Sequence, residues 1–295
     1  MSDEAAPAEL TVRASDGRTL EVRTAGSPGG LPLVFHHGTP GGAEFYPPMV
    51  AAAVRRGLQL VIYARPGYGG SSPAPGRQVA DAAADVAAIL DELGEQHFVS
   101  LGWSGGGPHA LACARLLPER CIAAATMAGV APHDADGLDW LAGMGDDNLV
   151  EFAAAVGGEA ELTKLLTEAA QLLRQLTAAE LVDGLGDLVS AADTAVLHGE
   201  LADYLLASFH SGLRPGIDGW RDDDLAFVRD WGLRLDGGAP VAVWQGDQDR
   251  MVPLAHGTWL AAHLPAARTH IMPGVGHLSL PIDDVVDDLL ELAGR

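Results

Sequence analysis

A serine in a glycine-rich turn is the side chain best placed for nucleophilic chemistry. Residues 102–106, GWSGG, match G-x-S-x-G, with a strand predicted before them at 98–101 and a helix after them at 109–117. Such a turn exposes the hydroxyl, and its glycines avoid clashes where the chain folds back on itself. A helix-capping serine is the structural alternative. A phosphate loop would need a lysine after the glycines, which is missing. The pattern therefore predicts Ser104 as a nucleophile.

Acyl transfer by a serine also needs two backbone N–H groups that hold the oxyanion of the tetrahedral intermediate. Gly105, directly after the nucleophile, is one candidate donor. The loop HHGTPGG at residues 36–42 follows a predicted buried strand at 31–35, and we expect Thr39 to supply the second donor. An ordinary turn is the alternative for this loop, because Gly and Pro are common in turns. The candidates for lining the substrate pocket are His37, Gly38 and Trp103, and we expect His37 and His109 to fix loops by hydrogen bonds.

The serine needs a base, and the base needs a carboxylate that orients it. Of 11 histidines, His277 lies in a glycine-rich loop just after a predicted strand at 269–272. Asp249 follows another predicted strand, at 241–244, and both loops lie where open α/β sheets place their sites. Asp247 competes with Asp249, and either aspartate could simply form a turn. We find neither H-E-x-x-H nor a tight ligand cluster, so we expect no metal and no cofactor.

The elements that must position these residues alternate between strand and helix. Further strands are predicted at 58–63 and 122–127, a hairpin at 10–12 and 20–23, and helices at 45–56, 81–93, 254–264 and 282–292. This alternation predicts a doubly wound, mostly parallel sheet of about eight strands. Between residues 132 and 218 the chain is helical and acidic, without strand signals. We therefore expect a catalytic domain in two pieces, 1–131 and 219–295, interrupted by a helical cap at 132–218.

Composition limits the partners. The 295 residues contain 18 basic and 40 acidic side chains, for a net charge of -22. Such a surface repels nucleic acid and anionic membranes, so we expect a small-molecule substrate. The acidity is compatible with either solubility or salt adaptation, and the oligomeric state, monomer or homodimer, is left open. The N-terminus shows no signal peptide and no apolar run suits a membrane span, which predicts a cytoplasmic protein. The two cysteines, Cys113 and Cys121, are expected to be free thiols.

Taken together, the motifs resemble those of the α/β-hydrolase superfamily over nearly the whole chain except the cap. HHGTPGG resembles the H-G-x-P-G oxyanion motif, ARPGYGGSS at 64–72 the R-G-x-G-x-S loop, and GWSGGGPHALA the nucleophile elbow. GDQDRMVP resembles the acid loop, in which the carboxylate stands three residues after the glycine, at Asp249. GVGHLSL resembles the final histidine segment. The order Ser104, Asp249, His277 is that of the family, so the resemblance implies a Ser-His-Asp mechanism.

The motifs say less about the substrate. The sequences of the H-G-x-P-G and R-P-G-Y-G-x-S motifs are similar to those of proline iminopeptidase-like members, although the sequence of the nucleophile elbow departs from that group. Epoxide hydrolases and haloalkane dehalogenases carry Asp at the nucleophile position, so Ser104 argues against both. We expect a small to medium carboxylic ester. The alternatives are an aminopeptidase or amidase, a C–C bond hydrolase or lactonase, and a ligand-binding receptor on the same fold. An amine substrate would need acidic partners in the cap, for which the candidates are Glu151, Glu159, Glu161 and Asp203.

Overall fold

The computed structural model describes residues 5–295, so the first four residues of the N-terminus, where no signal peptide was predicted, lie outside the described residues. The chain begins with the predicted hairpin. Strand β1 (Ala5–Arg13) pairs antiparallel with β2 (Thr19–Gly26), and Gly17 in the turn between them has φ 91°, a conformation that glycine adopts without strain.

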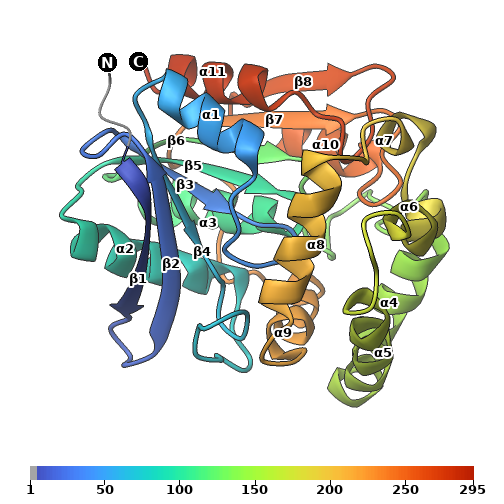
Figure 1. Cartoon of the computed structure of the whole chain (residues 1–295). Helices are drawn as coiled ribbons and strands as arrows, with labels where there is room; N and C mark the ends of the chain where they lie inside the picture. Colours follow the sequence, from blue (N-terminus) through green and yellow to red (C-terminus); the bar gives the residue numbers. More distant parts are fainter. Residues whose placement is uncertain (1–4) are drawn as a thin grey trace.

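One sheet of eight strands, in the order β1-β2-β4-β3-β5-β6-β7-β8, forms the centre of the molecule (Figure 1). Strand β2 is antiparallel to β1 and β4, whereas all other neighbours are parallel. This arrangement confirms the predicted doubly wound, mostly parallel sheet. The remaining strands are β3 (Pro32–His36), β4 (Gln59–Tyr63), β5 (Phe98–Trp103), β6 (Cys121–Met127), β7 (Val241–Gly246) and β8 (Arg268–Met272).

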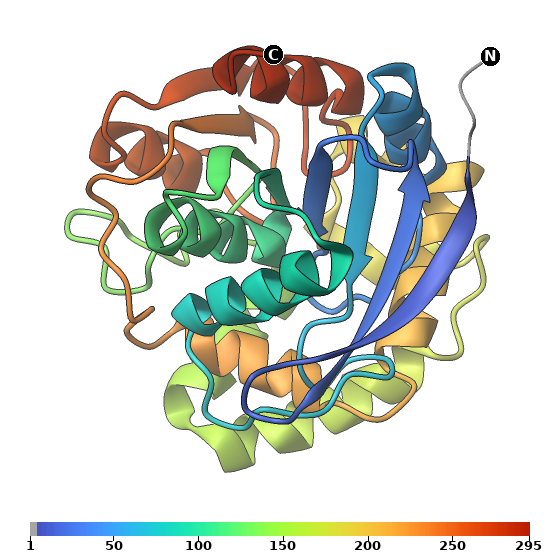
Figure 2. The same cartoon turned by 90° about the vertical axis from the view of Figure 1, so that its left-hand side faces the viewer.

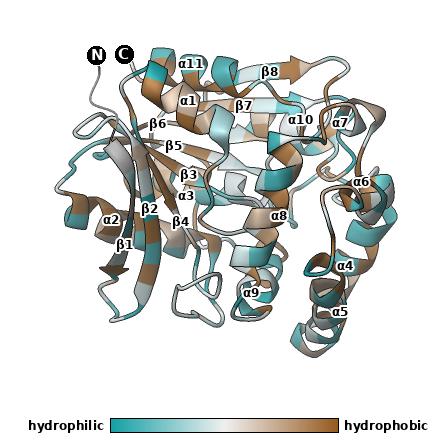
Figure 3. Ribbon diagram, viewed as in Figure 1, coloured by the Kyte–Doolittle hydropathy of each residue, from teal (hydrophilic) through white to brown (hydrophobic). Residues whose placement is uncertain are grey.

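Helices cover both faces of this sheet, and Figure 2 shows the two layers from the side. Helices α1 (Pro47–Arg55) and α11 (Ile282–Leu292) pack together on one face. Helices α2 (Ala82–Leu93), α3 (Gly107–Leu116) and α10 (Leu254–His263) cover the other. Strands β3, β5 and β7 are buried along their whole length, and Figure 3 shows hydrophobic residues concentrated in the sheet. Parallel strands with both faces covered are expected to be apolar throughout.

The segment between β6 and β7 is fully described and contains helices but no strand. Its helices are α4 (Asp146–Gly157), α5 (Glu159–Leu173), α6 (Leu181–Leu185), α7 (Ala191–Thr194), α8 (Glu200–Gly212) and α9 (Asp218–Phe227). Helix α5 buries Leu162, Leu166 and Ala170, a spacing of four residues that places one apolar stripe on its inner face. Figure 1 shows this segment beside the carboxyl ends of the parallel strands. The cap predicted at 132–218 spans α4 to α8, and α9 begins at its last residue.

Cys113 and Cys121 are buried free thiols, as predicted. Across residues 5–295, no helix has the length and apolar character needed to cross a membrane.

Candidate active site

Ser104 stands at the sharp turn between β5 and α3. Its φ is 56°, an unusual value for a residue with a side chain, and it opens a single 3₁₀ turn, Ser104–Gly106. A Cβ at Gly102 would collide with the Gly106 carbonyl, and a Cβ at Gly106 would collide with the His36 carbonyl. The chain can make this turn only because both positions lack side chains, and the turn leaves Ser104 half-buried at the wall of a pocket.

His277 and Asp249 form a buried pair. The His277 Nδ1 lies 2.9 Å from Asp249 Oδ2 and 3.1 Å from Oδ1, so the hydrogen of the neutral ring is assigned to Nδ1. Burial by itself lowers the pKa of His277, but the charge and hydrogen bond of Asp249 raise this pKa above its ordinary value. Asp249 is fixed in turn by the backbone N–H groups of Met251 and Val252, at 2.9 and 2.8 Å, and by Gln245 Nε2 at 3.1 Å.

The competing carboxylate, Asp247, lies elsewhere. Its side chain is exposed, and its Oδ1 accepts the backbone N–H of Gly274 at 2.8 Å. The structure thus brings Asp249 against His277 and gives Asp247 the turn-forming contact that either aspartate could have made.

The serine and the histidine come together at one pocket. Both line it, and the Trp103 indole, next to Ser104, donates to the His277 carbonyl oxygen at 3.1 Å. Among the hydrogen bonds of residues 5–295, none joins the Ser104 hydroxyl to the His277 ring. Hydrogen bonds of this kind are often long in unliganded enzymes and shorten when the substrate binds.

The two candidate oxyanion donors belong to adjoining segments. A Cβ added to Gly105 would lie 2.8 Å from the Thr39 Cβ, and one added to Gly38 would lie 3.5 Å from the Ser104 Cβ. Gly38 and Thr39 line the same pocket as Ser104. The candidate oxyanion loop, residues 36–42, therefore runs directly beside Ser104.

A buried cluster around Asp223, which was not predicted from the sequence, holds this loop. Asp223 of α9 accepts hydrogen bonds from Thr39 Oγ1 at 2.7 Å, Tyr68 Oη at 2.9 Å, Arg65 Nη2 at 2.6 Å and Arg77 Nη2 at 2.6 Å. Arg65 also donates to the Gly38 carbonyl oxygen at 3.1 Å. Burial by itself raises the pKa of Asp223, but the charges of Arg65 and Arg77 outweigh this effect. The pKa of Asp223 therefore lies well below its usual range. The motif ARPGYGGSS, which contains Arg65 and Tyr68, was the only signal in the sequence.

His37 does not line the substrate pocket, which corrects one of the pocket candidates. Its ring is fully buried against Tyr68, its Nδ1 donates to the Gly38 carbonyl oxygen at 2.7 Å, and its Nε2 accepts the Arg65 N–H at 3.3 Å. Gly38 and Trp103, the other two candidates, do line the pocket. His37 is thus hydrogen-bonded within the loop, which is the role expected for it beside pocket lining. His109 fixes the turn after Ser104 in the same way, because its Nδ1 donates to the Gly105 carbonyl oxygen at 2.9 Å.

The pocket has a volume of about 580 Å³ and lies between the sheet and helices α4, α5, α6, α8 and α9. Its wall is mostly apolar, with Leu165, Leu172, Leu173, Leu176, Leu185, Leu188, Leu205 and Phe209. Its charged lining residues are acidic, namely Asp147, Glu151 and Glu168, and the described lining includes no Lys or Arg. Burial raises the pKa of Glu151 to about 6. Its Oε1 accepts the Trp220 indole N–H at 2.9 Å.

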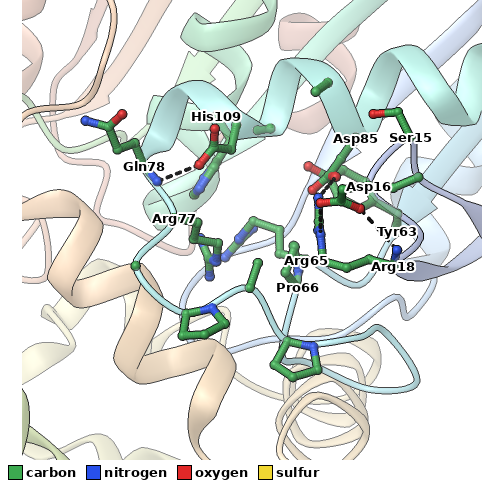
Figure 4. Close-up of a pocket in the computed structure, with 18 residues that line it drawn as sticks. Ser15, Asp16, Arg18, Tyr63, Arg65, Pro66, Arg77, Gln78, Asp85 and His109 are labelled. Carbon is green, nitrogen blue, oxygen red and sulfur yellow. Dashed lines mark hydrogen bonds and ion pairs between the residues drawn. The ribbon is translucent and has the colours of Figure 1, made fainter.

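Figure 4 shows a second cavity, of about 460 Å³. Arg65 and His109 form part of its wall, together with Arg77 and with Arg18, which pairs with Asp85 at 2.8 Å. Neither Ser104 nor His277 lines it, so this cavity is separate from the pocket of the candidate site. Within residues 5–295, no group of three or more His, Cys, Asp or Glu is arranged to hold a metal ion.

The chain is similar in sequence and in fold to several known proteins. A pimeloyl-[acyl-carrier protein] methyl ester esterase of Aromatoleum aromaticum is 30% identical over 78% of this chain and 86% of its own. A non-heme chloroperoxidase of Streptomyces lividans is 36% identical over 41% of this chain, and the match covers only 45% of that protein. A solved α/β-hydrolase fold protein from Nakamurella multipartita superimposes with a TM-score of 0.65 at 26% identity, covering 98% of this chain and 100% of the other. The family description "alpha/beta hydrolase fold" matches residues 32–284, and the chain therefore belongs to the α/β-hydrolase family of enzymes.

Proposed function

We propose that this enzyme is a serine hydrolase that cleaves a small to medium carboxylic ester with Ser104 as nucleophile, His277 as base and Asp249 as the orienting acid. The observation that carries the proposal is the buried pair of His277 and Asp249, whose Nδ1 and Oδ2 lie 2.9 Å apart, together with the position of His277 in the wall of the same pocket as Ser104, whose φ is 56°. Strained backbone conformations cluster at functional sites.

The proposed reaction has two steps. The Ser104 oxygen attacks the ester carbonyl while His277 takes its proton, and the N–H groups of Thr39 and Gly105 hold the oxyanion. The carbonyl–alkoxy bond then breaks, and the alcohol leaves with the proton from His277. In the second step a water molecule gives a proton to His277 and attacks the acyl-enzyme, which releases the carboxylic acid and returns the proton to Ser104.

The pocket supports the substrate class. Its leucine-rich wall suits an apolar acyl or alcohol group, because burial contributes roughly 25 cal/mol for each Å² of apolar surface removed from water. Asp147, Glu151 and Glu168 would repel an acyl chain that ends in a carboxylate, and the described lining has no cation to offset them. We therefore expect neutral esters to be preferred over esters of dicarboxylic acids.

Labelling with a fluorophosphonate tests the proposal directly. The wild-type protein should be labelled at Ser104, the His277→Ala variant should lose the labelling, and p-nitrophenyl esters should be turned over. Ser104→Ala should lower kcat by about 10⁶-fold. Full turnover by Ser104→Ala would reject the mechanism, and tight ligand binding by the wild type without turnover would favour the receptor alternative.

Glu151 favours a second candidate, an aminopeptidase or amidase. Of the four acidic cap residues named above, Glu151 is the one that lines the pocket, and a carboxylate can pair with a substrate ammonium group. Burial and then the charge of Glu151 raise the pKa of the fully buried Asp224 well above its usual range.

Kinetics on two substrates distinguish the candidates. Because the pKa of Glu151 is about 6, an aminoacyl substrate should bind more tightly as pH rises through 6, while KM for a neutral p-nitrophenyl ester should stay constant. Glu151→Gln should remove the pH effect for the aminoacyl substrate only. If aminoacyl-nitroanilides are not hydrolysed at any pH, the esterase proposal stands alone.

A further inference from the structure

Asp193, a residue of the cap, contacts the loop that carries the candidate base. It lies in the short cap helix α7 (Ala191–Thr194), and its side chain is fully buried. At the sequence level it is the fourth residue of a capping box with Ser190, whose hydroxyl donates to Asp193 Oδ2 at 2.8 Å. A capping box alone explains neither the burial nor the remaining contacts of this carboxylate.

Those contacts run along the loop that carries the base. Asp193 Oδ2 accepts the backbone N–H of His277 at 3.1 Å, and Oδ1 accepts the backbone N–H of Leu278 at 2.7 Å and the Ser279 hydroxyl at 3.3 Å. The fit is tight, because a Cβ added to Gly276 would collide with the same carboxylate. One cap side chain thereby fixes three consecutive residues of the loop. The first of them, His277, is 84 positions from Asp193 in the sequence.

The charge of Asp193 also acts on the ring of His277. The donors to Asp193 are uncharged N–H and O–H groups, so they do not neutralise the carboxylate. The charged groups that face His277 are Asp249, from the loop after β7, and Asp193, from α7; against the effect of burial, both raise the pKa of this histidine, Asp249 more strongly.

We infer that Asp193 is a positioning residue of the hydrolase: docked from the cap, it sets the place of the His277 loop and supplies a second negative charge near the base. This inference rests on the proposed function. It means that the base reaches its working position only while α7 is seated against the catalytic domain, so the cap takes part in assembling the catalytic machinery as well as in enclosing the substrate.

The first test replaces Asp193 by Asn, which keeps the size but removes the charge and turns one acceptor into a donor. With a neutral p-nitrophenyl ester we expect kcat to fall roughly 10- to 100-fold, which corresponds to losing hydrogen bonds to a charged group, while KM changes less than about 2-fold. The acid limb of the kcat/KM profile should move to lower pH, because less negative charge stabilises protonated His277. A purely structural role would reduce the active fraction without moving that limb.

The matched control is Asp183→Asn, the same substitution at an exposed aspartate of cap helix α6 (Leu181–Leu185), which should leave kcat and the pH profile unchanged. If Asp193→Asn does not fold, Gly276→Ala tests the same contact, since the added methyl group pushes the loop away from an intact Asp193 and should lower kcat while the far-UV circular dichroism stays that of the wild type.

Wild-type kcat and an unmoved acid limb in Asp193→Asn, or full activity in Gly276→Ala, would overturn the inference. Failure of the proposed function looks different, because Ser104→Ala would then keep its turnover. A protein in which Ser104→Ala is inactive and Asp193→Asn is fully active would retain the hydrolase mechanism and refute only the role of Asp193.

Discussion

At Ser104 the backbone takes a left-handed conformation, φ 56°, that costs of order 1–3 kcal/mol for a residue with a side chain. The surrounding structure maintains it: Gly102 and Gly106 pack too closely for any other residue, and Trp103 on the preceding position is tied to the His277 carbonyl oxygen. This strained conformation lies at the residue that we propose as the nucleophile. The Asp249 carboxylate is also held firmly, because it accepts hydrogen bonds from His277, Gln245 and two backbone N–H groups.

The choice between the two aspartates gives the first prediction. Asp249→Asn should lower kcat by about 10⁴-fold, because an amide at this position no longer selects the ring form of His277 that keeps Nε2 free to accept a proton. Asp247→Asn should change kcat by less than about 3-fold, since Asp247 contacts the Gly274 N–H and not the base. Steady-state kinetics on one p-nitrophenyl ester decide it. A larger loss at Asp247 would transfer the orienting role to that residue.

The pH profile gives the second prediction. The base must be neutral to accept the serine proton, so kcat/KM should fall as pH drops through the pKa of His277. Burial lowers this pKa, yet Asp249, with Asp193, raises it to above the ordinary value of 6.5. The acid limb of wild-type kcat/KM should therefore have its midpoint above that value. A midpoint well below it, measured in buffers of constant ionic strength, would mean that burial dominates and that Asp249 is not ionised beside the ring.

The three proposed catalytic residues could be selected from the sequence because each follows a predicted strand, and parallel strands bring their carboxyl ends to one edge of the sheet. Ser104, Asp249 and His277 come after β5, β7 and β8. The supporting carboxylates were not predictable in this way. Asp223 and Asp193 lie in helices of the acidic segment before β7, and their partners, Arg65 and the His277 loop, are 158 and 84 positions distant. Only the packing of the cap and of α9 against the catalytic domain brings them together.

At the scale of elements, α9 is fastened to the oxyanion loop by an ion cluster rather than by apolar packing alone. Asp223 receives two arginines, Arg65 and Arg77, which are themselves almost fully buried. Desolvating such charges is costly, and a buried cluster is retained at that cost only if its geometry is good. Here the cluster also carries the Thr39 side chain, so the element that follows the cap determines where the candidate oxyanion donor lies.

Removing the central charge is the third prediction. Asp223→Asn should lower the free energy of unfolding by about 3–5 kcal/mol, because Arg65 and Arg77 are left as buried cations without a full counter-charge. Urea denaturation followed by tryptophan fluorescence measures this change. Asp236→Asn, at an exposed aspartate paired with Arg234, serves as control and should leave the free energy of unfolding essentially unchanged, because water screens this surface pair. Equal stability of the two variants would show that the arginines find other acceptors.

The sequence also set limits at this scale. The alternation of strands and helices was predictable from local patterns, and so was the helical nature of the segment at 132–218. The arrangement of helices α4 to α8 was not, because their apolar faces show only that each packs against something, not which neighbour it meets. The pocket between them, and the position of Glu151 in its wall, consequently became visible only in three dimensions.

The whole molecule carries a net charge of -22, and its 18 basic residues cannot pair with more than a minority of its 40 acidic ones. Uncompensated repulsion among these carboxylates destabilises the compact state. Salt reduces this repulsion because the Debye length shortens from about 30 Å at 0.01 M to about 3 Å at 1 M.

The fourth prediction is that the melting temperature at pH 7 rises when NaCl is increased from about 10 mM to 1 M. The buried Arg65–Asp223 pair is screened little at any salt concentration, so it does not oppose this trend. Differential scanning calorimetry at constant pH measures the effect. Tetramethylammonium chloride should give the same rise if screening is the cause, whereas a rise with sodium alone would indicate specific cation binding to the acidic surface. An unchanged or falling melting temperature would show that exposed ion pairs such as Arg56–Asp287 outweigh the excess of negative charge.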